Sequence, residues 1–392
     1  MTSCAVAAPP TSLRPALAAA AGLAAAMGVG RFVYTPLLPV MVDAHRISAS
    51  DGAVIATANY AGYLLGAVLL ARRPQGSNPR SFRAAAVALV ASEALMAVPA
   101  PTPVAAALRL IAGVASAVVF VGCAGAMARH DGSGRAAGIA FGGVGFGIAL
   151  TGVLVLAARP VLSWQGMWLG AAALTAILLA PALRLDIRPG RAAGLAAAAP
   201  SRAWRALLPA YFLEGLGYIV IGTFLVAAVS EQRGPVLGSS VWIVVGAAAA
   251  PATVLWAAAA RRVTPALALP IALLAQAFSA LLPAVTGATW AVLVSAALFG
   301  ATFMGIVMLA MRVGGELSGA DAAAPLTAVY GAGQMLGPLV VAPVLGEGYR
   351  VAFAIATAVL GLAIAAALVV TRERARATTR RGAEITSGGT EC

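Results

Sequence analysis

The chain has 392 residues, of which 61% are hydrophobic and only 10% are charged, whereas an average soluble domain carries about 25% charged residues. This composition excludes an ordinary soluble domain. Apolar runs of roughly 20 residues recur along the whole chain, as transmembrane helices require, and the short alternating segments of a membrane β-barrel are not observed. Because backbone groups inside lipid must bond within the protein, we predict an all-α membrane protein.

Twelve transmembrane helices are predicted in chain order. They cover residues 14–41, 52–71, 82–100, 103–128, 135–158, 161–183, 205–229, 239–260, 264–285, 288–311, 322–345 and 350–371. The first apolar run is too long for the core of a signal peptide, so we interpret it as an uncleaved first helix.

A linker at residues 184–204, rich in arginine, proline and glycine, divides the chain near its middle. It separates an N-terminal six-helix half, residues 1–183, from a C-terminal six-helix half, residues 205–371. The last residues, 372–392, carry several arginines and are expected to form a disordered basic tail. The predicted fold is therefore two six-helix bundles joined by a linker.

The net charge of +13 comes from 26 basic residues that are all arginines. Twenty of them lie at the N-terminus, in alternate loops, in the linker and in the tail, and four lie in the other loops. Because cytoplasmic loops carry the excess of basic residues, both termini and the linker are predicted to be cytoplasmic in a multi-pass protein of the cell (inner) membrane. A charge that follows the topology in this way argues against a nucleic-acid partner.

The two halves resemble each other weakly. Gly28-Val29-Gly30 matches Gly215-Leu216-Gly217 at a shift of 187 residues, and Arg72-Arg73 matches Arg261-Arg262 at a shift of 189. A near-constant shift of about half the chain indicates a parallel six-helix repeat, an arrangement that secondary transporters use.

Four ionisable side chains fall inside predicted spans: Arg31, Glu93, Arg109 and Glu214. A charge at the bilayer centre costs about 2.5–3.5 kcal/mol on insertion scales, so such residues usually face a watery cavity or a partner. Counting along the helices places Glu214 near the midplane and Arg109 near the outer end of its helix, where its side chain could extend to water. We expect Arg31 and Glu214 to face a cavity, and Glu93 either to titrate or to pair with Arg109 or Arg31.

Polar and aromatic neighbours could complete a cavity with a few polar groups in an apolar wall. The stronger candidates are Tyr34, Thr35, Asn59 and Tyr218; Thr223, Gln276 and Gln334 are weaker ones. Each could instead form only an interhelical hydrogen bond.

Prolines and glycines give a second group of candidates. Pro36, with Pro39, is predicted to kink the first helix and to free backbone carbonyls toward a cavity. Gly142 and Gly337 each follow another glycine by four residues, a spacing that lets helices approach closely. They are expected to pack helices tightly, or to lie at interfaces that slide during gating.

Several blocks of sequence carry a family resemblance: GVGRFVYTPLLPVM at 28–41, ANYAGYLLG at 58–66, YFLEGLGY at 211–218, TFMG at 302–305 and GAGQMLGP at 331–338. They resemble the YbfB/YjiJ-type branch of the major facilitator superfamily over most of the chain. The resemblance implies a twelve-helix secondary transporter of the inner membrane that works by alternating access. One departure is Leu70, which stands where the superfamily's usual 2–3 loop has an acidic residue.

The sequence thus favours a secondary active transporter of a small organic solute, coupled to protons. Arg31 would attract an anionic group of the substrate or a carboxylate partner, and Glu214, with Glu93 as the second candidate, would exchange protons. The alternative is a membrane sensor or scaffold with a transporter-like fold. An enzyme is not expected, because no nucleophile–base pair or metal-binding spacing is present; we also expect no cofactor, a monomer, and the lipid bilayer and a small-molecule substrate as partners.

Overall fold

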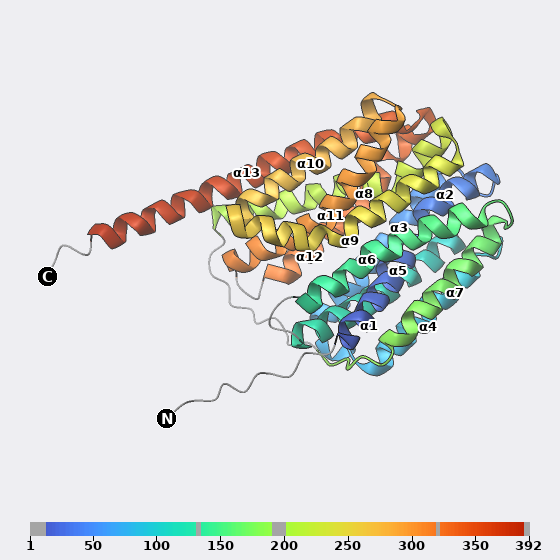
Figure 1. Cartoon of the computed structure of the whole chain (residues 1–392), viewed down its shortest axis with the longest axis horizontal. Helices are drawn as coiled ribbons and strands as arrows, with labels where there is room; N and C mark the ends of the chain where they lie inside the picture. Colours follow the sequence, from blue (N-terminus) through green and yellow to red (C-terminus); the bar gives the residue numbers. More distant parts are fainter. Residues whose placement is uncertain (1–12, 131–134, 190–200, 319–321, 388–392) are drawn as a thin grey trace.

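A computed structural model describes residues 13–130, 135–189, 201–318 and 322–387, and every regular element in these residues is helical. The chain begins with one interrupted helix, made of α1 (Arg14–Leu23), the π-helical η1 (Ala24–Val29) and α2 (Tyr34–Asp43). The other N-terminal helices are α3 (Ala49–Arg72), the short η2 (Pro74–Gly76), α4 (Pro79–Leu95), α5 (Thr102–His130), α6 (Arg135–Ala158) and α7 (Trp164–Ala182). The C-terminal helices are α8 (Arg202–Arg233), α9 (Pro235–Val263), α10 (Pro265–Val285), α11 (Thr289–Ser318), α12 (Ala323–Val341), the short η4 (Ala342–Glu347) and α13 (Tyr349–Ser387) (Figure 1).

All twelve predicted segments are helical, and eleven helical segments of the described chain are long and apolar enough to cross a membrane. The exception is α4, which has 17 residues and ends at Leu95 rather than near residue 100 as predicted. Pro99 and Pro101 follow it, and a proline disfavours the helical conformation at the residue before it.

Polar side chains define where several helices begin. The Ser48 hydroxyl accepts a hydrogen bond from the Asp51 backbone N–H, and the Asp51 carboxylate accepts one from the Ser48 N–H, which forms a capping box at the start of α3. Ser163 and Ser201 cap α7 and α8 in a similar way. These caps satisfy N–H groups that a helix leaves unpaired at its first turn.

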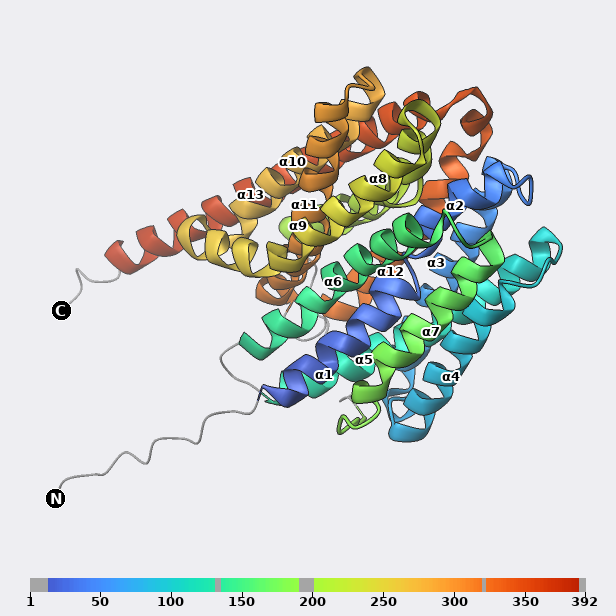
Figure 2. The ribbon, with the colours of Figure 1, turned by 45° about the vertical axis from the view of Figure 1, so that its right-hand side comes forward.

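The N-terminal and C-terminal helices meet at a contact surface, here called the seam, where α2 packs on α8, α3 on α12, and α6 on α9. Figure 2 shows α6 and α9 side by side between the two sets of helices. A β-carbon on Gly145 would lie 2.3 Å from the backbone nitrogen of Ala250, and one on Gly142 would lie 3.1 Å from the Ala250 oxygen. The α6–α9 contact therefore depends on glycine at these positions, because a β-carbon there would force the two backbones apart.

Gly337 has the same role within the C-terminal helices. A β-carbon there would lie 2.3 Å from Ile219 Cγ2 and 2.7 Å from the Leu216 oxygen, so Gly337 lets α12 pack directly on α8. The structure thus places Gly142 at the seam and Gly337 at an internal contact of the C-terminal helices.

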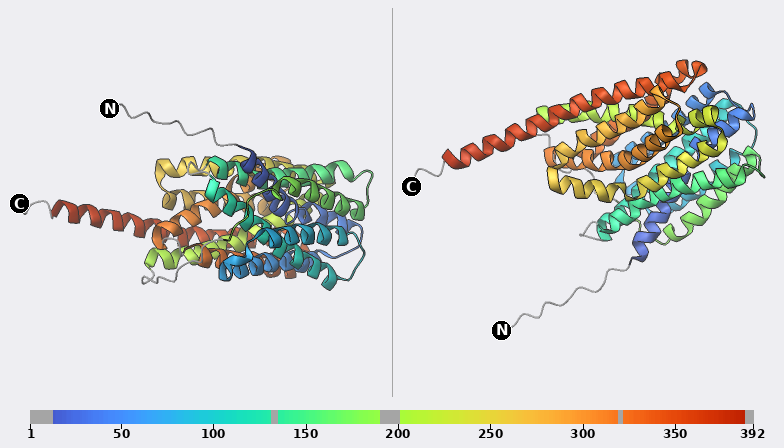
Figure 3. Two further views of the ribbon diagram at one scale, coloured as in Figure 1. Left: turned by 90° about the horizontal axis from the view of Figure 1, so that it is seen from below. Right: turned by 45° about the horizontal axis from the view of Figure 1, so that its top comes forward.

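A hydrophobic core crosses the seam. The Phe32 ring lies 6.1 Å from Trp242 of α9 and 6.2 Å from Phe303 of α11. The beginning of α1 and the end of α13 lie at the same end of the molecule (Figures 1 and 3).

The end of the chain corrects one expectation. The sequence predicts a disordered tail from residue 372, but α13 continues as a helix to Ser387. Its alanines, arginines and glutamates are good helix formers. Arg374 also pairs with Glu316 of α11, and Arg376 lies 3.1 Å from Glu373 on the same helix. Most of the predicted linker, residues 190–200, lies outside the described residues.

Candidate functional site

The first helix is interrupted at Gly30–Val33, between η1 and α2. Pro36 has no N–H to donate, and the Thr35 N–H bonds to the Phe32 oxygen at 3.2 Å, a shorter loop than an α-helix uses. Carbonyl groups of the interruption therefore lack their usual helical partners and must be satisfied by another part of the protein.

Arg109 of α5 provides these partners. Its Nη2 donates to the Gly30 oxygen at 2.8 Å and to the Arg31 oxygen at 3.2 Å. The guanidinium lies 5.8 Å from the Tyr34 ring and 5.6 Å from the Trp168 ring, and the residue is only 1% exposed. The Asn59 amide donates to the Arg109 backbone oxygen at 2.8 Å and so ties α3 to α5 beside the interruption.

This geometry corrects two predictions. Arg109 does not extend to water at the outer end of its helix; it is buried and hydrogen-bonded to the first helix. The carbonyl that Pro36 deprives of a donor, that of Phe32, accepts from the Thr35 N–H, and Arg109 binds the neighbouring carbonyls of Gly30 and Arg31, so all three are satisfied within the protein rather than turned to a cavity. Counting residues along α5 could not show this, because the acceptors arise from an irregular helix that lies far away in sequence.

Arg31 projects from the same interruption to the seam and is 3% exposed. It donates a hydrogen bond to the side-chain oxygen of Gln334 in α12. Its guanidinium also lies 4.5 Å from the Tyr63 ring and 5.0 Å from the Tyr60 ring. Among the residues that the structure describes, no carboxylate lies within 4 Å of this charge.

Gln334 joins Arg31 to the C-terminal helices, because its amide nitrogen donates to the Tyr218 hydroxyl of α8 at 2.9 Å. The structure therefore brings two predicted residues, Arg31 and Tyr218, together through a third that was a weaker candidate. Gln334 was hard to rank because it stands 303 residues from Arg31 in the sequence.

Two further hydrogen bonds cross the seam nearby. The Thr35 hydroxyl donates to the Gly222 oxygen at 2.6 Å, and the Tyr60 and Thr223 hydroxyls lie 3.0 Å apart. Tyr34 instead bonds within the N-terminal helices, where its hydroxyl donates to the Gly52 oxygen at 3.1 Å. Thr35 is therefore a seam residue, whereas Tyr34 packs within the N-terminal helices, against Trp168 and the Arg109 guanidinium.

Glu214 lies in α8 and is fully buried. The Gln276 amide of α10 donates to its Oε1 at 3.1 Å, and Oε2 has no hydrogen-bond partner among the described residues. Tyr211 and Tyr218 share the face of α8 that carries Glu214, since they stand three and four residues from it. One oxygen of the Glu214 carboxyl group is thus hydrogen-bonded and the other is not, and aromatic side chains lie on the same face of α8.

Those rings form a stack, which we call the tyrosine stack: Tyr211, Tyr330 and Tyr218. Tyr330 lies 4.4 Å from Tyr211 and 5.5 Å from Tyr218, with interplanar angles of 10° and 7°. Phe303 continues it at 6.1 Å from Tyr218. The stack leads from the Glu214 side of α8 to the Tyr218 hydroxyl, and so to Gln334 and Arg31.

Glu93 stands apart from this arrangement. It lies in α4, is fully buried, and neither of its oxygens has a hydrogen-bond partner among the described residues. The predicted ion pair with Arg109 or Arg31 is not formed, because neither guanidinium lies within 4 Å of it. Both arginines use neutral acceptors instead: backbone carbonyls for Arg109 and Gln334 for Arg31.

The aromatic residues around Arg31 were not among the candidates predicted from sequence. Tyr60 and Tyr63 are three residues apart on α3, so they share a face of that helix. This spacing was visible in the sequence, but it is equally typical of tyrosines that only pack against other helices.

Comparisons with known proteins agree with this architecture. The family model described as "Uncharacterised MFS-type transporter YbfB" matches residues 23–371. A crystal structure of a bacterial homolog of the human lysosomal transporter Spinster, in an inward-facing and unoccupied conformation, is similar with a TM-score of 0.66. The match covers 93% of this chain and 98% of that one at 14% identity, so it shows the fold alone. No curated protein matches the sequence.

The Arg109 contacts predict a stability effect. Arg109→Gln should lower the free energy of unfolding by roughly 2–4 kcal/mol, because buried carbonyls lose charge-assisted donors. Thermal melting of the purified protein in detergent would measure it, with Arg262→Gln at the exposed end of α9 as the matched control. Equal melting temperatures for the two variants would show that Arg109 does not hold the interruption.

Proposed function

Because this chain belongs to the YbfB-type family of major facilitator transporters, we propose that it is a secondary active transporter that moves a small organic anion by alternating access, coupled to protons. The observation that carries the proposal is the buried charge of Arg31, which has no carboxylate within 4 Å among the described residues.

A buried guanidinium is costly unless its charge is compensated. Gln334 is neutral, and the faces of Tyr60 and Tyr63 stabilise a buried cation by about 2 kcal/mol each, without supplying a negative charge. An anion that reached Arg31 would supply the missing charge through two-armed hydrogen bonds, the geometry in which arginine binds carboxylates. The Nε of Arg31 has no partner among the described residues and is available for this purpose.

We assign the seam as the surface between two six-helix halves, residues 1–183 and 205–371, with both termini and the linker in the cytoplasm of an inner-membrane protein. The contacts of α2 with α8, α3 with α12 and α6 with α9 support this division. So does the common end at which α1 begins and α13 finishes (Figure 3). Arg31 and Tyr218 then occupy equivalent helices of the two halves, where an alternating-access site is expected.

The contacts along the first helix support a state closed on the outer side. Its second part, α2, packs on α8, and the bonds Thr35–Gly222 and Tyr60–Thr223 close the seam there. Its first part, α1, packs on α5, α6 and α7 of its own half. Opening to the outside would break these two hydrogen bonds, and the glycine contact at Gly142 would let α6 move against α9 without bulky side chains.

Proton coupling is assigned to Glu214. A buried carboxyl group that exchanges a proton can link the solute to a pH gradient. One oxygen of Glu214 bonds to Gln276, while the other has no described partner and can carry a proton. A protonated Glu214 would also remove a negative charge from the site when the anion binds at Arg31. Glu93, enclosed in the N-terminal helices, is the second candidate for this role.

The anion assignment predicts a binding defect. Arg31→Gln should weaken carboxylate binding at least tenfold, which corresponds to about 1.4 kcal/mol, because an amide offers no charge to the anion. A thermal-shift panel of aliphatic and aromatic monocarboxylates on the purified protein would identify the probe, and equilibrium binding of that compound would measure the change. Arg46→Gln, in the segment between α2 and α3, is the control. Unchanged affinity in Arg31→Gln, or no stabilisation of the wild type by any anion, contradicts the assignment.

The coupling assignment predicts a separate defect. In proteoliposomes, Glu214→Gln should abolish accumulation of the labelled anion driven by a pH gradient but keep exchange of labelled for unlabelled anion, because glutamine preserves the shape and cannot release a proton. Glu231→Gln, an exposed position on the same helix, is the control. Wild-type accumulation by Glu214→Gln contradicts the role of Glu214. If the wild type binds the anion but transports none, the protein is instead a sensor or scaffold.

A further inference from the structure

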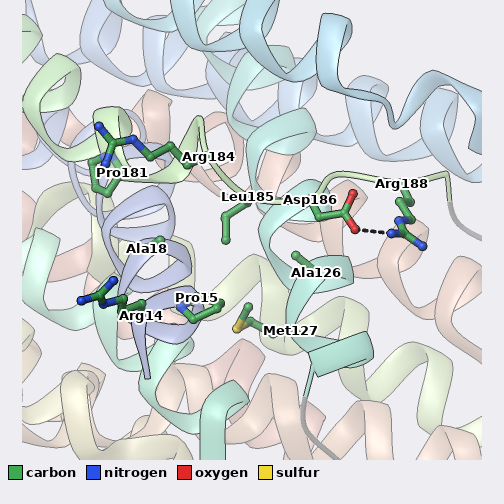
Figure 4. Close-up of a pocket in the computed structure, with 10 residues that line it drawn as sticks. All are labelled: Arg14, Pro15, Ala18, Ala126, Met127, Pro181, Arg184, Leu185, Asp186 and Arg188. Carbon is green, nitrogen blue, oxygen red and sulfur yellow. Dashed lines mark ion pairs between the residues drawn. The ribbon is translucent and has the colours of Figure 1, made fainter. Parts of the chain in front are cut away.

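A cavity lies outside the proposed transport site, at the end of the molecule where α1 begins. Its volume is about 690 Å³, and the ends of α1, α5 and α7 enclose it together with the segment that follows α7. The lining residues are Arg14, Pro15, Ala18, Ala126, Met127, Pro181, Arg184, Leu185, Asp186 and Arg188 (Figure 4).

The cavity has an apolar interior and charged rims. In Figure 4, Pro15, Met127 and Leu185 lie between the rims, and the side chains of Arg14 and Arg184 extend to the same side. On the other side, Arg188 forms an ion pair with Asp186 at 2.6 Å. With three arginines and one aspartate, the lining carries an excess of positive charge next to an apolar surface.

The depth of these arginines in the membrane follows from the helices. Arg14 is the first residue of the span Arg14–Asp43, and Arg184 stands two residues beyond the end of the span Trp164–Ala182. Both therefore lie at the boundary between hydrocarbon and water, where the phosphate groups of lipids are found and where long cationic side chains place their heads.

From this arrangement we propose that the cavity is a binding site for an anionic phospholipid. The phosphate group lies between Arg14 and Arg184, and part of an acyl chain packs against Ala18, Ala126 and Met127. A free phosphate ion would make no favourable contact with the apolar side chains. A phospholipid would contact both the arginines, through its phosphate, and the apolar lining, through its acyl chain. A soluble phosphate would engage the rim only.

Such a lipid would hold three helix ends together. It would connect α1, which continues into the interruption that carries Arg31, to α5, which carries Arg109, and to the segment after α7. We therefore expect the bound lipid to stabilise the N-terminal helices whether or not solute is present.

The test uses the full chain in detergent, with dioleoylphosphatidylglycerol as the probe. Native mass spectrometry counts bound lipid and thermal melting measures its effect. Arg14→Gln/Arg184→Gln should lower the apparent affinity at least tenfold. Ala18→Leu, which keeps every charge but fills the cavity, should lower it comparably. Arg261→Gln/Arg262→Gln removes two exposed arginines at the end of α9 and should leave it unchanged.

Three results would overturn the proposal. Equal loss in the Arg261/Arg262 double variant would show attraction by general charge rather than by the cavity. Undiminished binding by Arg14→Gln/Arg184→Gln would show that the lipid sits elsewhere. Stabilisation by inorganic phosphate, or by dioleoylphosphatidylcholine, equal to that by the anionic lipid would show that the combination of charge and acyl chain is not what the cavity recognises. Because Arg14 and Arg184 are both exposed, their double variant is expected to fold, and it tests the proposal even if Ala18→Leu does not fold.

Discussion

The hydrogen bonds from Arg109 to the carbonyl oxygens of Gly30 and Arg31 are the interaction on which the rest of the site depends. Inside a membrane, an interrupted helix survives only where protein groups replace the missing backbone bonds. Arg109 does so with a side chain that is itself buried, and Asn59 fixes its backbone. The interruption then directs the Arg31 side chain across the seam to Gln334 and Tyr218. Arg109 thus has a structural role: it stabilises the interruption from which the Arg31 side chain reaches Gln334.

The two buried arginines differ in what surrounds them. Arg109 is enclosed by backbone carbonyls and by the rings of Tyr34 and Trp168, all from the N-terminal helices. Arg31 contacts Tyr60 and Tyr63 on its own side and Gln334 on the other, so the proposed opening of the seam would change its surroundings. Gln334 connects Arg31 to the Tyr218 hydroxyl, and the tyrosine stack continues from Tyr218 toward Glu214. The proposed coupled transport would use both features: the Arg31 charge at the contact between the two sets of helices, and the protonatable Glu214 one turn away from Tyr218 along α8.

The helices were predictable from sequence because apolar length determines them, and the unusual charges within them pointed to Arg31, Arg109 and Glu214. Their partners were not predictable. Gln334 and Gln276 lie 303 and 62 residues from the side chains they bind, and no local periodicity connects them. Arg109 was misplaced because its acceptors come from an irregular backbone that residue counting treats as regular. The tail was misjudged because charge suggested disorder, although its alanine, arginine and glutamate content favours helix.

The central claim is that the guanidinium of Arg31 binds the transported anion. The most direct measurement gives Arg31 a permanent partner: in Gln334→Glu, the new carboxylate stands where the amide oxygen now accepts the hydrogen bond from Arg31. Melting temperature and carboxylate binding would be measured together at neutral pH. We predict that the variant melts at a higher temperature than the wild type and no longer binds the anion, because an internal carboxylate occupies its site. Wild-type affinity for the anion in this variant would contradict the claim.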